Sequence, residues 1–264
     1  MTDRITSNEN AITVLTPVYI NTPERFNYFQ TAIESFKACC LFSGRIYHHV
    51  IDDGSPLCSA EIVEYCSKSN LTFLGRIERD SRRGFFEILQ KLYASVKTRY
   101  CVYLEPDHYF YLPYDFITPI TRLYEIVPDL HQVYLRAPLE YRQFFLKDEF
   151  LITHDKTILF RIRIDEQNTG WVGRGRNHES FSFMPGVFKT ETIAEYFLNS
   201  FIPGDRPSDI EPTLARHWAF RHITGYLNAQ AFCYHIGAAG SEGQGGYLKL
   251  PDSRYESVWS NKIL

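Results

Sequence analysis

The sequence predicts an α/β protein in which helices flank a mixed, mainly parallel sheet. Strand-like and helix-like segments alternate through the first half, as is typical of right-handed βαβ units. Polar residues follow the predicted strands, at the end where open parallel sheets bind their ligands. The chain has 264 residues and is 44% apolar, enough for one sizeable core. We therefore expect a single domain over residues 1–264.

The first half contains four strand-like segments separated by three amphipathic helices. In the first helix, Phe29, Ile33 and Phe36 recur at helical spacing and mark a buried face. A turn string, DDGSP, closes the second strand. The pattern predicts strands at 11–18, 45–52, 71–76 and 99–106, and helices at 23–40, 59–66 and 84–96.

The second half is less regular. Helical patterns occupy 115–127, 191–201 and 209–223, and strand patterns occupy 132–137, 157–164 and 227–236. A glycine-rich segment, GAAGSEGQGG, follows at 237–246, and such a permissive sequence does not hold one conformation by itself. We expect it to be a loop that closes over a ligand.

Composition and charge exclude several classes of protein. The formal net charge of −3 gives no overall positive field for nucleic acid. Six cysteines form no CxxC pair, which is typical of buried thiols in a reducing compartment. No 18-residue apolar run and no signal-peptide pattern occurs, so we expect a cytoplasmic protein without a transmembrane segment. Nothing in the sequence indicates an oligomeric state.

Acidic residues follow two of the predicted strands. Glu105 and Asp107 end the fourth strand, and Asp52 and Asp53 end the second. Two acids spaced in this way can bind a divalent cation, directly or through the phosphates of a ligand. The alternative is an ordinary surface turn, and Asp-Gly-Ser is common turn chemistry. Their convergence at one edge of the sheet favours a binding site.

Further candidates lie in the second half. His235 precedes the glycine-rich segment and could complete a metal site or contact phosphate. Arg176 and His178 lie in a basic loop that could bind phosphate or line an acceptor site. Asp209 and Glu211 lie where a helix begins, and a carboxylate there could deprotonate an acceptor hydroxyl. The alternatives are a strand-end histidine, a solvated basic loop and acids that favour a helix N-terminus.

Two phosphate-binding motifs are absent from the sequence. It contains neither GxxxxGK[ST] nor a GxGxxG after the first strand. A bound phosphate would therefore be held by a metal and by side chains, which points again to Glu105 and Asp107.

The chain resembles the GT-A-fold glycosyltransferases, in particular the large inverting group called family two. The stretch ITVLTPVYINTPERFNYFQTAIESF resembles the opening strand, turn and first helix of that group. HHVIDDGSP resembles its VVDDGS motif, and RRGFFEILQKLYASVKTRYCVYLEPDHYF resembles the block that ends in its D-x-D motif, which reads E-P-D in this chain. Looser resemblance extends over 170–240.

The resemblance implies a role for each matching residue. One group would bind the nucleotide or another substrate, with Asp53 on the base and Glu105 near the ribose. By resemblance its members are Thr16, Pro17, Tyr19, Asp53 and Glu105, and we add Asp52, Arg83, Arg176 and His178 as further candidate binding residues. Asp107 and His235 would hold Mn2+ or Mg2+. Glu211, or failing that Asp209, would be the catalytic base.

The implied activity is transfer of a sugar from a nucleotide diphospho-sugar, a UDP-sugar, to an acceptor hydroxyl. The acceptor would be a glycan or glycoconjugate, as in polysaccharide biosynthesis, and the transfer would invert the anomeric carbon. Residues 11–110 would form the nucleotide-sugar-binding half and residues 111–264 the acceptor-binding and catalytic-base half. Two alternatives remain open: a sugar nucleotidyltransferase, and a non-catalytic carbohydrate-binding protein with a degenerate site.

Overall fold

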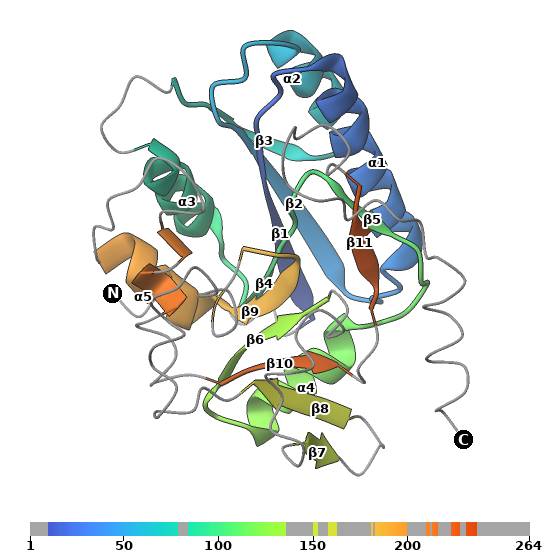
Figure 1. The fold of residues 1–264 in the computed structure, drawn as a ribbon, viewed down its shortest axis with the longest axis vertical. Coiled ribbons are helices and arrows are strands. Elements are labelled where there is room, and N and C mark those ends of the chain that lie inside the picture. Colours follow the sequence, from blue (N-terminus) through green and yellow to red (C-terminus); the bar gives the residue numbers. More distant parts are fainter. Residues whose placement is uncertain are drawn as a thin grey trace, which may run out of the picture.

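The structure is a computed structural model of the 264-residue chain. It describes residues 10–78, 84–135, 150–152, 158–162, 181, 183–199, 210–211, 213–215, 223–227 and 231–236. Within this part of the chain, five helices pack around one nine-stranded sheet and a separate two-stranded sheet (Figure 1). The helices are α1 (Pro23–Cys39), α2 (Ser59–Lys68), α3 (Gly84–Ser95), α4 (Ile117–Ile126) and α5 (Thr190–Asn199).

The large sheet has the strand order β3-β2-β1-β4-β9-β6-β10-β8-β7. Its strands are β1 (Ala11–Val18), β2 (Arg45–Asp52), β3 (Thr72–Arg76), β4 (Tyr100–Tyr103), β6 (Leu130–Tyr134), β7 (Phe150–Ile152), β8 (Ile158–Ile162), β9 (Gly186–Lys189) and β10 (Ile223–Leu227). The pairings show that all of these run in one direction except β9 and β8. The predicted mixed, mainly parallel sheet flanked by helices is confirmed.

The small sheet pairs β5 (His108–Phe110) with β11 (Cys233–His235) in antiparallel register. The sequence predicted no strand at 108–110, and it assigned 227–236 to one late strand. That assignment is wrong, because β10 ends at Leu227 and β11 joins a different sheet. The helix predicted over 209–223 is also too long, because β10 begins at Ile223.

Alternating residues of the central strands bury two separate cores. On β1, Ile12, Val14 and Val18 face a core that also contains buried residues of α1 and α4. Leu15 faces the opposite core, which contains residues of α3 and α5. Residues that alternate along a strand point to opposite faces, so β1 is covered on both sides, as expected for a parallel sheet. Figure 1 shows α3 and α5 together on one side of the sheet and α1 on the other.

The sheet order creates a reversal point next to β1. The chain adds β2 and β3 on one side of β1 and then crosses to add β4 on the other side. In open α/β sheets, ligands bind beside such a reversal, at the carboxyl ends of the strands. Glu105 and Asp107 follow β4 at that edge, and Asp53 follows β2.

The structure bears on the cysteines and on membrane-spanning helices. All six cysteines are free thiols, and all except the partly exposed Cys58 are buried, as expected. Among the described helices, none is long and apolar enough to cross a membrane.

Candidate active site

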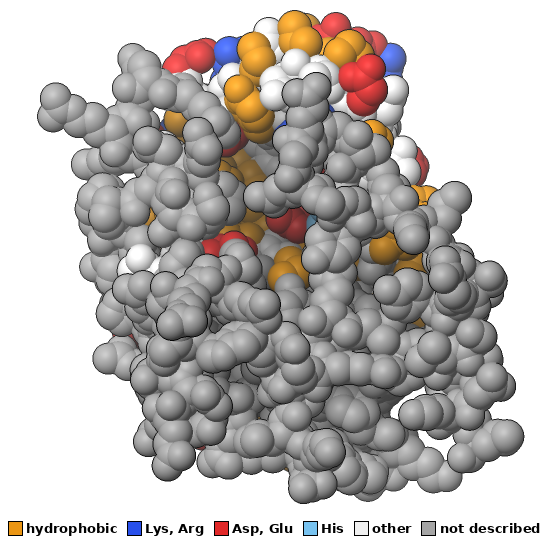
Figure 2. Space-filling model, in the orientation of Figure 1, with side chains coloured by type: hydrophobic (Ala, Val, Ile, Leu, Met, Phe, Trp, Pro, Cys, Tyr) orange, Lys and Arg blue, Asp and Glu red, His pale blue; other side chains and the backbone are white. Residues whose placement is uncertain are grey.

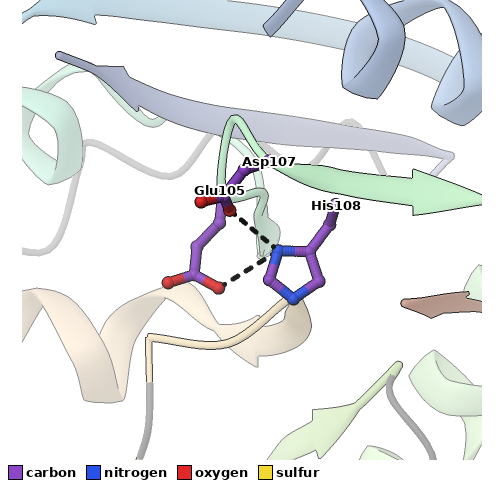
Figure 3. A group of neighbouring side chains, drawn as sticks. All are labelled: Glu105, Asp107 and His108. Carbon is purple, nitrogen blue, oxygen red and sulfur yellow. Dashed lines mark ion pairs between the residues drawn. The ribbon is translucent and has the colours of Figure 1, made fainter. Parts of the chain in front are cut away.

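Three side chains converge directly after β4. The chain turns at Pro106 and Asp107, and β5 then begins at His108. His108 Nδ1 lies 3.3 Å from Glu105 Oε2 and 3.3 Å from Asp107 Oδ1. Figure 3 shows the two carboxylates pointing toward the same imidazole nitrogen. Ligand atoms of the three residues all lie within 4.8 Å of one another, close enough to share one metal ion.

A fourth side chain reaches the group from β11. His235 pairs with His108 across the two-stranded sheet, and their ring centroids are 5.0 Å apart. His235 Nε2 is hydrogen bonded to Asp107 Oδ2 at 3.0 Å. The backbone N–H of Ile236 donates to the carbonyl of Asp107 at 2.7 Å, which fixes the end of β11 on the turn. We call Glu105, Asp107, His108 and His235 the acid–histidine cluster.

The cluster is partly open to solvent. The His108 side chain is 0% exposed, whereas those of Glu105, Asp107 and His235 are 29%, 25% and 28% exposed. A ligand could therefore reach the carboxylates from one side while the imidazole of His108 supports them from the interior. Figure 2 shows a hollow near the centre of this face, with acidic and histidine side chains visible inside it.

The histidines control the ionisation of Asp107. Burial alone would raise the pKa of this carboxyl, but the hydrogen bonds and charges of His108 and His235 outweigh that effect. The pKa of Asp107 therefore lies well below its ordinary value. Asp107 is a carboxylate at neutral pH, which is the form that binds a cation.

Glu211 reaches the same edge of the sheet from a helical segment in the second half. It is buried, and its Oε1 accepts a 2.6 Å hydrogen bond from the backbone N–H of Phe183. Phe183 precedes β9, whose first residue, Gly186, pairs with Tyr103 at the end of β4. The rings of Phe183 and Tyr103 are 5.3 Å apart. Glu211 is thereby held beside the strand that carries the cluster.

Tyr103 links the acids of three different segments. Burial raises the pKa of its hydroxyl well above the ordinary value, and the charges of Glu105, Tyr93, Glu211 and Asp53 raise it further. Charges act over several ångströms, so Asp53, Glu105 and Glu211 all lie within electrostatic range of one buried tyrosine.

Asp52 and Asp53 are adjacent in sequence and have different surroundings. Asp52 is fully buried; its Oδ1 accepts from the backbone N–H of Ser55 at 2.8 Å and its Oδ2 from the hydroxyl of Ser59 at 3.0 Å. These bonds fix the turn and the start of α2. The sequence predicted a nucleotide contact for both acids. In the structure both carboxylate oxygens of Asp52 are used within the protein, and the nucleotide contact of Asp52 stays a prediction.

Two of the predicted nucleotide contacts, Thr16 and Pro17, lie within β1 and are buried. Thr16 is fully buried on the face covered by α1, where its hydroxyl is hydrogen bonded to His48 Nε2 at 2.9 Å. This hydrogen bond joins β1 to β2 in the core, and the contact of Thr16 with a nucleotide base stays a prediction. Pro17 is buried within β1, opposite Ile51 of β2. Tyr19, just beyond β1, is half-buried at the carboxyl edge and stays a candidate.

Four predicted site residues lie outside the described part of the chain: Arg83, Arg176, His178 and Asp209. The same holds for the glycine-rich segment 237–246. Conversely, sequence reasoning assigned no role to His108 and did not single out Tyr103 or Phe183. The position of His108 directly after the E-P-D triplet was the signal that could have identified it.

The chain is similar to known proteins in its structure and not detectably in its sequence. No protein-family model matches the chain, and no curated protein matches it in sequence. A fragment of S. aureus TarS, solved in complex with UDP-GlcNAc, matches 93% of this chain with a TM-score of 0.57 and 14% identity. Glucosyl-3-phosphoglycerate synthase from Mycobacterium tuberculosis, solved with phosphoglyceric acid, matches 86% of this chain with a TM-score of 0.50 and 16% identity.

The chain has the GT-A fold. The predicted fold class is thereby confirmed, and at these identities the comparison establishes the fold alone. The match to the TarS fragment without ligand covers 86% of this chain and 60% of the fragment, with a TM-score of 0.56. This GT-A chain thus spans about three fifths of that TarS fragment, and 72% of the synthase.

Proposed function

We propose that this chain is a glycosyltransferase that moves a sugar from a nucleotide diphospho-sugar to an acceptor hydroxyl. The acid–histidine cluster carries the proposal, because it lies at the sheet reversal where open α/β folds bind ligands. The GT-A fold supports the same conclusion, and the TarS fragment of that fold was solved with UDP-GlcNAc. A UDP-sugar is the donor that we propose for this chain.

The donor would be held by residues at the carboxyl edge of the sheet. Asp53 accepts hydrogen bonds from the base, with Tyr19 beside it, and Glu105 lies near the ribose. Asp107 and His235 would hold Mn2+ or Mg2+, because the low-pKa carboxylate of Asp107 and the imidazole of His235 suit such an ion. The bound ion would neutralise charge on the departing diphosphate. This assigns residues 11–110 to the donor and residues 111–264 to the acceptor and the base.

Glu211 is the base in this proposal. Its carboxylate accepts the proton of the acceptor hydroxyl while the acceptor oxygen bonds to the anomeric carbon and the bond to the diphosphate oxygen breaks. Attack opposite the leaving group inverts the anomeric configuration. The hydrogen bond from Phe183 fixes the orientation of the carboxylate before the acceptor binds. A glycan or glycoconjugate hydroxyl is the acceptor class that we propose.

A comparison of two aspartate variants tests this function. We expect Asp107→Ala to abolish release of UDP from UDP-sugars and to remove the thermal stabilisation that UDP gives in the presence of Mn2+. Asp129→Ala is the control, because Asp129 is an exposed acid before β6, at the opposite edge of the sheet. Unchanged turnover in Asp107→Ala would overturn the proposal.

The product and the binding profile separate the alternatives. Release of pyrophosphate in place of UDP would indicate a sugar nucleotidyltransferase. Absence of stabilisation by any nucleotide-sugar in a thermal-shift screen with and without Mn2+ would favour a non-catalytic carbohydrate-binding protein with a degenerate site.

A further inference from the structure

We propose that His108 is itself a ligand of the divalent ion, so that the site offers two imidazole nitrogens and two carboxylates. Such a site would select transition-metal ions such as Mn2+ and Co2+ over Mg2+ and Ca2+. The inference builds on the proposed function, because this ion is the one that assists donor binding. It concerns metal chemistry alone, however, and can be tested without any donor.

The spacing of the side chains fits one shared ion. His108 Nδ1 lies 3.3 Å from a carboxylate oxygen of Glu105 and of Asp107, and Asp107 Oδ2 lies 3.0 Å from His235 Nε2. An octahedral ion with metal–ligand bonds of about 2.1 Å places neighbouring ligands about 3 Å apart. The ligand atoms of Glu105, Asp107 and His108 are therefore close enough to share one ion, and His235 lies beside the second oxygen of Asp107.

The fold holds His108 in this place. The side chain is fully buried, and its strand, β5, is paired with β11 through His235. On the following position of β5, Tyr109 packs against Tyr234 of β11 with ring centroids 5.4 Å apart. A buried imidazole between these contacts cannot turn to solvent without opening the two-stranded sheet. The fold thus fixes the imidazole of His108 against the two carboxylates, as preorganised sites require.

The nitrogens determine the predicted selectivity. Mg2+ and Ca2+ prefer oxygen ligands, and Mg2+ keeps several of its waters. Imidazole favours transition-metal ions, whose affinity for a given site rises from Mn2+ through Co2+. A site with only carboxylates would discriminate weakly between Mn2+ and Mg2+. Two histidines beside Glu105 and Asp107 therefore predict the affinity order Co2+, then Mn2+, then Mg2+.

Titration calorimetry on the full chain without nucleotide tests the selectivity. We expect His108→Asn, which replaces the nitrogen by an amide oxygen of similar reach, to weaken Mn2+ binding by about tenfold or more. Mg2+ affinity should change much less, so the ratio of the two affinities falls. The matched control is His49→Asn. His49 is a partly buried histidine of β2 that lies outside the cluster and is hydrogen bonded to Ser95 of α3. This control should keep the wild-type ratio.

A spectroscopic count of ligands keeps the inference testable even if His108→Asn fails to fold. Pulsed electron paramagnetic resonance on the wild-type chain loaded with Mn2+ reports nitrogen nuclei bound to the ion. Two histidine nitrogens support the inference, and one or none overturns it. An unchanged ratio of Mn2+ to Mg2+ affinity in a folded His108→Asn variant also overturns it.

The two proposals fail in distinguishable ways. If Mn2+ binds through two nitrogens but no nucleotide-sugar binds with the metal present, the metal site stands and the transferase activity does not. If UDP-sugar turnover persists in a chelator and no Mn2+ binds to the chain, the activity stands and the metal site does not.

Discussion

Asp107 and His235 are 128 residues apart in the sequence and are joined by a 3.0 Å hydrogen bond. This contact brings the end of β4 and the end of β11 into one site. Asp107 depends on His235, together with His108, for its low pKa.

Glu211→Gln should leave the fold intact and slow transfer. Glutamine keeps an oxygen that accepts the hydrogen bond from Phe183, but it cannot take up the proton of an acceptor hydroxyl. We expect kcat for transfer to fall by about 10²–10⁴-fold while binding of UDP, measured by calorimetry, changes little. Glu125→Gln is the control, since Glu125 is an exposed partner of Arg99. A kcat within about threefold of wild type would show that Glu211 is not the base.

Asp52 and Asp53 should separate into a structural residue and a ligand-binding residue. Asp52→Ala leaves the N–H of Ser55 and the hydroxyl of Ser59 without their acceptor, so we expect a loss of about 2–3 kcal/mol in the free energy of unfolding. Denaturant unfolding measures this loss. Asp53→Asn should keep that stability and raise KM for the donor. A destabilised Asp53→Asn variant with normal KM would contradict this division.

His48 should make the free energy of unfolding depend on pH. Burial, with smaller contributions from Lys37 and His49, lowers the pKa of this imidazole from 6.5 to about 3. As pH falls below 6.5, the unfolded chain takes up a proton that the folded chain rejects. Stability is therefore lost progressively between about pH 6.5 and pH 3, by up to about 1.4 kcal/mol per pH unit, and this effect is absent above that range.

The difference between the wild type and His48→Asn isolates this effect from other titrating groups. Urea unfolding at pH 7, 6, 5 and 4 gives the free energy of unfolding of both proteins. The wild type should lose more stability than the variant at each step toward acid. Parallel pH profiles would show that His48 titrates normally in the folded state.

Gly186 should be intolerant of a side chain. A Cβ at this position would lie 3.1 Å from the carbonyl oxygen of Val133, on the neighbouring strand β6. Backbone in the middle of a sheet yields little, so Gly186→Ala should displace the segment that carries Phe183. We expect a lower melting temperature together with a lower kcat for transfer. Gly75→Ala would not test steric crowding. Gly75 has open space around the position of a Cβ, and its positive φ of 112° would strain any other residue.

The first half of the fold could be predicted from sequence because each helix and strand there is marked by a pattern within its own segment. The apolar periodicity of 11–18 and 23–40 identified β1 and α1, and the turn string after residue 52 marked the end of β2. β9 gave no such signal. It has four residues, and its place between β4 and β6 depends on antiparallel pairing with strands far away in the sequence.

Several residues of the site could be identified from sequence, but their contacts with one another could not. Asp107 and Glu105 were identified because acids follow a strand end, and His235 because it ends a late strand. Sequence reasoning treated Asp52 and Asp53 alike, yet successive residues of an extended chain point in opposite directions. One therefore faces the turn and the other the region of Tyr103. His108 was overlooked although it directly follows the E-P-D triplet, because its burial beside two carboxylates depends on the pairing of β5 with β11.

The pairing of β5 with β11 has a consequence for synthesis on the ribosome. Translation at about 5–20 residues per second makes His235 roughly 6–26 s after Asp107. During that interval the emerging chain carries two neighbouring carboxylates with only His108 beside them. His235 is the last of the four cluster residues to be made, so a ribosome that stalls just before β11 would leave a polypeptide with all nine described strands of the large sheet and an incomplete acid–histidine cluster.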